Sequence, residues 1–111
     1  MQKSFSYALK GISDALKSEI NLRIHFIISI IVTLLAVYFK FTPVEFAILF
    51  LTIFLVIILE FINTVIEKFS DIVHPDKSEE VRIVKDISAG AVLLGATLSI
   101  IVGLFLFLPK L

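Results

Sequence analysis

The chain has 111 residues, of which 59% are hydrophobic, and its ten basic and ten acidic residues give a formal net charge of zero. This hydrophobic fraction exceeds the roughly 45–50% of soluble domains, and the mean hydropathy is +1.06. Composition therefore predicts a single integral membrane domain over 1–111 and argues against bulk nucleic-acid binding. The absence of cysteine excludes disulfides, thiolate metal sites and cysteine nucleophiles. Carboxylates, amines and amides must carry any chemistry.

The segment 1–22 has apolar and basic residues at helical spacing. Its lysines fall on other faces than its apolar residues, which are Phe5, Leu9, Ile12, Leu16 and Ile20. This pattern predicts an amphipathic helix that lies on an anionic lipid surface. An ordinary packed amphipathic helix is the alternative. Because the segment lacks an early apolar core and a small-residue cleavage site, we do not expect a removable signal peptide.

Long apolar stretches follow and predict three membrane-spanning helices. The expected limits are 24–41, 43–74 and 87–108, with a cytoplasmic loop over 75–86. Pro75 and Pro109 should stop the second and third spans, because proline disfavours helical conformation in the residue before it. Asp76 or Ser78 is placed to cap a short helical lead-in to the third span.

The second span begins with a clear helix-start signal. Thr42 is the predicted N-cap, Pro43 occupies the first helical position, and Glu45 is the capping-box partner of Thr42. Phe41 and Phe46 are placed to form the hydrophobic staple that accompanies such a box. We therefore expect a sharply defined turn between the first two spans.

The distribution of basic residues predicts the orientation in the membrane, because cytoplasmic loops carry an excess of Lys and Arg. With the N-terminus inside, only Lys40 and Lys110 lie outside. The basic residues that then lie inside are Lys3, Lys10, Lys17, Arg23, Lys68, Lys77, Arg82 and Lys85. The sequence therefore predicts a multi-pass protein with a cytoplasmic N-terminus and an outer C-terminus.

The second span also carries carboxylates into the membrane. Counted from Pro43 at 1.5 Å per residue, Glu60 lies roughly 25 Å along a hydrocarbon core of about 30 Å, just inside the cytoplasmic boundary. Asn63, Glu67 and Asp71 continue the same helical stripe towards water. An ionisable group within a span is costly unless it faces a partner or a cavity, so Glu60 and Asn63 are functional candidates. A structural hydrogen bond between helices is the alternative for both.

Other segments bring polar residues to the same depth. Glu19 ends the first helix, and Lys85 and Asp86 precede the third apolar stretch. Phosphoryl transfer needs such groups, because carboxylates hold Mg²⁺, a cation contacts the phosphate oxygens, and a carboxylate orients or deprotonates the attacking hydroxyl. A surface ion pair of little energetic value is the alternative for Lys85 and Asp86. The small residues at 88–91 favour close helix packing, or leave room for a nucleotide or lipid.

The remaining polar features are less informative. No Walker-type glycine-lysine loop or protein-kinase signature occurs, so any ATP site must be built from helix faces and helix ends. His25 and His74 are too far apart in sequence to indicate a metal pair. We assign no role to either histidine.

The motifs around these residues resemble those of the prokaryotic diacylglycerol kinase and undecaprenol kinase family. Segment 60–67, EFINTVIE, is similar to the family pattern E-x-x-N-[ST]-x-[IV]-E, and segment 85–93, KDISAGAVL, is similar to K-D-x-x-A-G-A-V-L. Segment 19–23, EINLR, resembles E-x-N-x-R and is preceded at the usual distance by YALKG at 7–11. The resemblance covers nearly the whole chain. It fails in the loop 73–82, where nucleotide contacts are left unassigned.

The resemblance implies an all-α, homotrimeric enzyme of the bacterial cytoplasmic (inner) membrane, with each active site shared between subunits. Such an enzyme uses Mg-ATP to phosphorylate a lipid alcohol. By position, Glu60 matches the general base, and Asn63 matches a residue lining the reaction centre. Glu19 and Glu67 match ligands of the Mg²⁺ that is bound with ATP. Lys85 and Asp86 match contacts to the nucleotide phosphates, and Tyr7 matches an adenine-side contact.

Two other functional classes remain as alternatives at this point. A small multidrug-type transporter would use an intramembrane glutamate as its proton and cation site, nearer to mid-bilayer and without need of Lys85 and Asp86. A non-catalytic membrane interaction subunit would have no reason to gather carboxylates and an amine at one depth. Diacylglycerol and undecaprenol both present a primary hydroxyl on a long apolar chain, and both remain candidate substrates.

Overall fold

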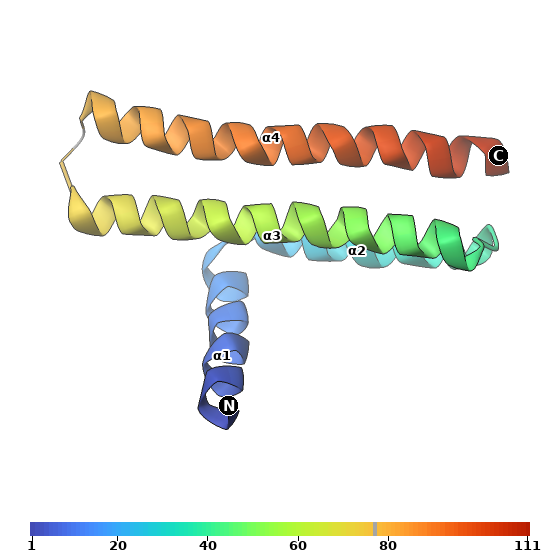
Figure 1. The fold of residues 1–111 in the computed structure, drawn as a ribbon, viewed down its shortest axis with the longest axis horizontal. Coiled ribbons are helices and arrows are strands. Elements are labelled where there is room, and N and C mark those ends of the chain that lie inside the picture. Colours follow the sequence, from blue (N-terminus) through green and yellow to red (C-terminus); the bar gives the residue numbers. More distant parts are fainter. Residues whose placement is uncertain (77) are drawn as a thin grey trace.

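The computed structural model describes residues 1–76 and 78–111, and within these residues every regular element is a helix. The elements are α1 (Gln2–Ser18), α2 (Ile20–Tyr38), α3 (Pro43–Val73), α4 (Glu79–Phe107) and the short 3-10 helix η1 (Leu108–Lys110). Helices α2, α3 and α4 run side by side along the long axis of the molecule, and α1 projects from the side of α2 and α3, away from α4 (Figure 1). The predicted all-helical class is therefore confirmed. Lys77, which contributed to the predicted orientation, lies outside the described residues.

The three aligned helices have the dimensions of membrane spans. Helix α2, helix α3 and the segment Glu79–Lys110 are each long and apolar enough to cross a bilayer. Helix α3 has 31 residues, which corresponds to about 46 Å at 1.5 Å per residue, whereas the hydrocarbon core is about 30 Å thick. The polar C-terminal part of α3 therefore extends beyond the apolar layer when its N-terminal part spans it.

The break between the first two helices lies at Glu19, earlier than the expected limit after residue 22. Glu19 is extended, with φ −118° and ψ 111°. Leu22 is fully buried and belongs to the packed face of α2. The Arg23 guanidinium donates hydrogen bonds to the backbone oxygens of Leu16 and Lys17 at 3.3 and 3.1 Å. These bonds satisfy carbonyls that the end of α1 leaves without helical partners, so they stabilise the earlier break.

The turn between α2 and α3 has the predicted geometry. The Thr42 hydroxyl accepts a hydrogen bond from the Glu45 backbone N–H at 3.2 Å, and the Glu45 carboxylate accepts one from the Thr42 N–H at 2.8 Å. The Phe41 and Phe46 rings lie 5.8 Å apart between centroids. Lys110 adds an ion pair to Glu45 at 3.0 Å. The capping box and the accompanying aromatic contact are confirmed. The ion pair between Lys110 and Glu45 also joins the C-terminal end of the chain to this turn.

Helix α4 begins earlier than the expected third span, and the connection before it is correspondingly short. Ser78 is the N-cap, because its hydroxyl accepts a hydrogen bond from the Val81 N–H at 3.2 Å. Glu79 and Glu80 occupy the first turn, where negative charge interacts favourably with the helix dipole. The predicted lead-in is thus continuous with the apolar helix, and the expected loop over 75–86 is mostly helical.

Buried apolar packing is concentrated near the end of the bundle that holds the α2–α3 turn. The buried cluster there consists of Ala36, Phe41, Leu49 and Leu106, with Phe39, Phe46 and Phe107 packed against it. Elsewhere the three spans are mainly exposed in the single chain, because only 11%, 28% and 11% of their apolar windows are buried. Helices that are apolar all round are typical of membrane spans.

Helices α3 and α4 approach each other closely at Gly95. A Cβ atom on Gly95 would lie 2.6 Å from Leu59 Cδ1, which is too close for van der Waals contact. Gly95 is buried, and small residues at such points allow membrane helices to pack tightly. The close approach holds α4 beside the part of α3 that carries Glu60.

We expect the substitution Gly95→Val to destabilise the protein, because its side chain must displace Leu59 or separate the two helices. Overpacking of this kind costs about 1–3 kcal/mol of unfolding free energy. Gly103→Val is the matched control on the same helix, since an added Cβ there meets no atom within 4 Å. Thermal unfolding in detergent should give a lower melting temperature for the Gly95 variant than for the Gly103 variant. Equal melting temperatures would contradict the close approach.

Candidate functional site

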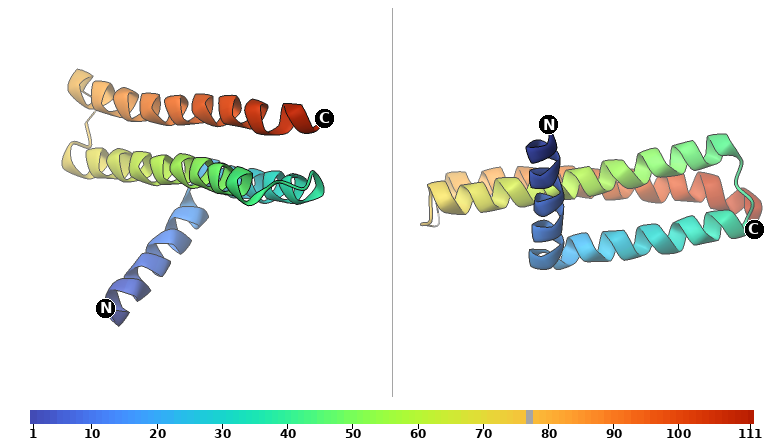
Figure 2. Two further views of the ribbon diagram at one scale, coloured as in Figure 1. Left: turned by 45° about the vertical axis from the view of Figure 1, so that its right-hand side comes forward. Right: turned by 90° about the horizontal axis from the view of Figure 1, so that it is seen from below.

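Polar side chains gather in the half of the bundle that contains the α3–α4 connection, which we call the polar half. Helix α3 supplies Glu60, Asn63, Glu67 and Asp71 to it, in the order expected for one helical stripe. Helix α1 runs across the bundle on the side of α2 and α3 (Figure 2). The junction of α1 and α2 therefore brings Glu19 to the same region.

Glu60 is the one buried charged residue among those that the structure describes, with 7% of its surface exposed. Its Oε1 lies 3.4 Å from Nε2 of His25 on α2. The His25 side chain is 26% exposed, so it reaches from the buried carboxylate to the surface of the chain. Burying a carboxylate is costly unless a partner compensates for its lost hydration. His25 is placed to be this partner.

Asn63 connects α4 to Glu67. The Ser88 hydroxyl donates a hydrogen bond to Asn63 Oδ1 at 2.7 Å, and Asn63 Nδ2 donates one to Glu67 Oε1 at 3.1 Å. Ser88 is buried, and the other two residues are partly buried. The interhelical hydrogen bond that was the alternative role for Asn63 is therefore present. The second hydrogen bond of Asn63 orients the Glu67 carboxylate.

Glu19 is brought to the turn of α3 that carries Glu67. Its Oε1 lies 3.6 Å from Nζ of Lys68, the residue that follows Glu67. Both members of this ion pair are partly exposed, so the pair adds little to stability. The ion pair instead positions the α1–α2 junction beside the polar part of α3.

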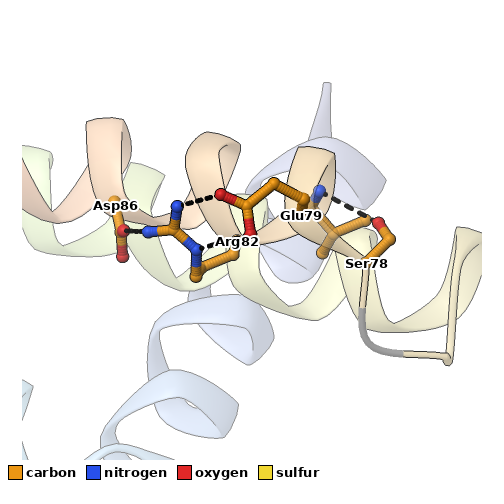
Figure 3. Close-up of polar contacts among 5 residues, drawn as sticks. Ser78, Glu79, Arg82 and Asp86 are labelled. Atoms are coloured by element: carbon orange, nitrogen blue, oxygen red, sulfur yellow. Dashed lines mark hydrogen bonds and ion pairs between the residues drawn. The ribbon is translucent and has the colours of Figure 1, made fainter.

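Lys85 and Asp86 are adjacent in sequence but contact different partners. Lys85 Nζ lies 2.5 Å from Asp71 Oδ1, and this contact joins α4 to the end of α3. Asp86 accepts a hydrogen bond from Arg82 at 2.7 Å, and Arg82 also contacts Glu79 (Figure 3). The ion pair between Lys85 and Asp86 themselves, weighed as an alternative from the sequence, is not among the described contacts.

Tyr7 lies on α1 and is 71% exposed. Its hydroxyl makes no hydrogen bond to any part of the chain that the structure describes. The structure therefore gives no support from within the single chain for the adenine-side role. That role stays a prediction.

The carboxylates of this region are candidate ligands for Mg²⁺. Among residues 1–76 and 78–111, no three His, Asp or Glu side chains are gathered closely enough to hold a metal ion on their own. Mg²⁺, however, is commonly bound by one or two carboxylates together with substrate phosphates and waters. Glu19, which contacts Lys68, and Glu67, which precedes Lys68 in sequence, supply a donor set of this chemistry. Their metal-binding role remains a prediction.

Several cavities lie near these groups, and two of them differ in the character of their linings. An apolar cavity of about 230 Å³ lies between α2, α3 and α4, with His25 in its lining at one end and Phe107 at the other. A more polar cavity of about 450 Å³ lies at the α3–α4 connection, where its lining includes Asp71, Arg82, Lys85 and Asp86. Apolar and charged cavities thus occur on either side of the Glu60–Glu67 stripe.

Sequence reasoning missed the contacts of His25, Ser88 and Lys68. His25 was given no role, although it begins the first apolar stretch at the depth calculated for Glu60. That shared depth was the available signal for the pair. Ser88 was considered only as one of several small residues, and its hydroxyl could not be paired with Asn63 without knowing how α3 faces α4.

The contact between Ser88 and Asn63 leads to a stability prediction. Asn63→Leu leaves the buried Ser88 hydroxyl without its acceptor, and such a loss costs about 1–3 kcal/mol of unfolding free energy. Replacing both partners with apolar groups is much less costly. In a double-mutant cycle of Asn63→Leu and Ser88→Ala, thermal unfolding in detergent should therefore show a smaller combined loss than the sum of the single losses. Strictly additive losses would show that the two side chains do not interact.

Comparison with known proteins adds evidence from the whole chain. Residues 6–107 match the family model described as prokaryotic diacylglycerol kinase. The chain is similar to a diacylglycerol kinase of Synechocystis sp., with 41% identity over 109 residues that cover 97% of this chain and 62% of the relative. It is also similar to an undecaprenol kinase of Bacillus subtilis, with 35% identity over 109 residues that cover 98% of this chain and 89% of the relative. The chain thus spans less than two thirds of the Synechocystis protein but most of the Bacillus protein.

Proposed function

Because the chain belongs to the prokaryotic diacylglycerol kinase family, a family of lipid kinases, we propose that it transfers the γ-phosphate of Mg-ATP to the hydroxyl of a membrane lipid. The observation that carries this proposal is the buried Glu60 carboxylate at the junction of apolar and charged surroundings. A lipid hydroxyl and a nucleotide phosphate can meet only at such a junction. The products are a lipid phosphate and ADP.

Glu60 acts as the general base in this proposal. The apolar chain of the lipid lies in or beside the cavity lined by His25 and Ile57, which places its hydroxyl near the turn that carries Glu60. The carboxylate takes the hydroxyl proton as the lipid oxygen attacks the γ-phosphorus. General-base catalysis of this kind contributes about 10²–10⁴ to a rate.

The nucleotide lies on the polar side of Glu60. Glu19 and Glu67 hold Mg²⁺, which neutralises charge on the phosphate oxygens when it is bound. Lys85 and Asp86 contact the phosphates from the charged cavity at the α3–α4 connection, and Tyr7 contacts the adenine. These contacts require Lys85 and Asp86 to exchange their present partners for the nucleotide. Catalysis is then chiefly positioning and electrostatic stabilisation.

The proposal includes a homotrimer with shared sites, in a bacterial cytoplasmic membrane. The outward faces of α2 and α4 expose apolar residues along most of their lengths, which leaves surface for neighbouring copies as well as for lipid. Helix α1 lies on the membrane surface with its lysines towards water. Diacylglycerol and undecaprenol are the two acceptor lipids to compare, since the named relatives differ in this respect.

The kinase activity can be tested with purified protein and both lipids. We expect Mg-ATP-dependent phosphate transfer to one or both lipids, and a fall in kcat of about 10²–10⁴ for Glu60→Gln because the general base is lost. Glu67→Gln should chiefly raise the KM for Mg-ATP. Glu80→Gln is the matched control, because Glu80 is exposed in the first turn of α4, away from the proposed roles. Folded protein that transfers phosphate to neither lipid would refute the proposal.

The proposed orientation can be tested separately, because the chain has no cysteine of its own. The single substitutions Lys3→Cys and Leu111→Cys each introduce one thiol at a chain end. In spheroplasts, a membrane-impermeant maleimide should label Leu111→Cys directly and Lys3→Cys only after permeabilisation. The reverse pattern would establish the opposite topology.

A further inference from the structure

His25 occupies a position that connects the lipid-side cavity with the buried carboxylate. It lies on α2, it contributes to the lining of the apolar cavity, and its Nε2 faces Glu60 Oε1 at 3.4 Å. Within the described part of the chain it is the one basic side chain with a nitrogen within 4 Å of the Glu60 carboxylate. No fully buried side-chain nitrogen or oxygen among these residues lacks a partner, and the described side-chain hydrogen bonds involve neither oxygen of the Glu60 carboxylate.

Glu60 needs a group of this kind for two physical reasons. An ionised carboxylate with 7% exposure has lost most of its hydration, and a nearby donor or cation restores part of the lost stabilisation. A general base must also present one oxygen to the hydroxyl in a fixed direction. An imidazole N–H directed at Oε1 meets both needs, because it leaves the other oxygen free.

We propose that His25 is a positioning residue for Glu60, an inference that rests on the lipid kinase function proposed above. The His25 Nε2–H donates to Glu60 Oε1 and holds the carboxylate towards the end of the apolar cavity. Glu60 Oε2 then accepts the proton of the lipid hydroxyl. The lipid oxygen forms a bond to the γ-phosphorus, the bond between that phosphorus and the bridging oxygen of ADP breaks, and the proton later passes from Glu60 to water. His25 keeps its own proton throughout.

The separation of 3.4 Å is longer than an ordinary N–H···O hydrogen bond of about 2.7–3.2 Å. Catalytic hydrogen bonds are commonly long before substrate binds and shorten in the substrate complex. His25 can make this small movement because its side chain is only partly buried and borders a cavity. The geometry therefore fits a contact that tightens when the lipid enters.

The test compares side chains that differ in where they place an N–H group. His25→Gln places an amide N–H at about the reach of Nε2, whereas the shorter His25→Asn does not, and His25→Leu has none. We expect kcat to fall about tenfold to a hundredfold in the Asn and Leu variants, a part of the usual contribution of a general base. The Gln variant should keep most of the wild-type kcat, and the KM for Mg-ATP should stay unchanged in all variants.

Thr33→Val is the matched control, since Thr33 lies two turns further along α2 and its hydroxyl bonds only to the Ser29 backbone oxygen. Melting temperatures in detergent identify any variant that fails to fold, and Gln and Asn provide a polar pair that a purely structural role would not distinguish. Equal kcat values for Gln and Asn, or full activity in Leu, would overturn the inference alone. Absence of lipid phosphorylation by the wild-type protein would overturn the proposed function, and the inference with it.

Discussion

The cost of placing an ionised carboxylate at the edge of an apolar bundle governs the arrangement of the polar half. Glu60 cannot be left among the apolar side chains of α3 without a partner, and the nearest element that offers one is the start of α2, through His25. This requirement fixes how α2 faces α3. Asn63 imposes a similar requirement on α4, which meets it with the buried Ser88 hydroxyl. The polar stripe of α3 thus determines which face each neighbouring helix presents.

The same arrangement creates a gradient of surroundings along α3. Ile57 borders an apolar cavity, Glu60 is buried but paired, Glu67 is partly buried, and Asp71 is exposed beside Lys85. A membrane lipid alcohol is mostly apolar, whereas a nucleotide is highly charged. The lipid kinase function proposed above would bring both molecules to α3, and this gradient would supply an environment for each.

Much of the fold was predictable from the sequence because helices in lipid satisfy their own backbone hydrogen bonds, so apolar length is informative. The capping box at Thr42 and Glu45 was predictable because it depends only on residues close in sequence. The helical lead-in before the third span was predicted, with Ser78 as one of two possible caps, but 75–86 was still described as a loop because its composition is polar. The structure shows that the lead-in and the apolar span form one continuous helix. The first helix was extended too far because Ile20 continues its apolar spacing but belongs to α2.

The residue types of the candidate site were also predictable, whereas their pairings were not. The long second helix that the sequence predicted does carry Glu60 and Glu67, but the partners of Lys85 and Asp86 depend on how the end of α3 faces the start of α4. Hydropathy and spacing contain no information on that rotation. The roles of Glu19, Tyr7, Lys85 and Asp86 towards ATP remain predictions, since they concern a ligand and neighbouring copies of the chain.

The two ends of α4 are each fastened to α3, by Lys85 with Asp71 at one end and by Lys110 with Glu45 at the other. Between them, Gly95 receives the Leu59 side chain. Sliding α4 along α3 by one helical turn would separate both ion pairs and remove the glycine from beneath Leu59. The α3–α4 pair is therefore held in one register, whereas α1 is joined to α2 at the extended residue Glu19. Slippage between α3 and α4 is opposed at three separate points along their length.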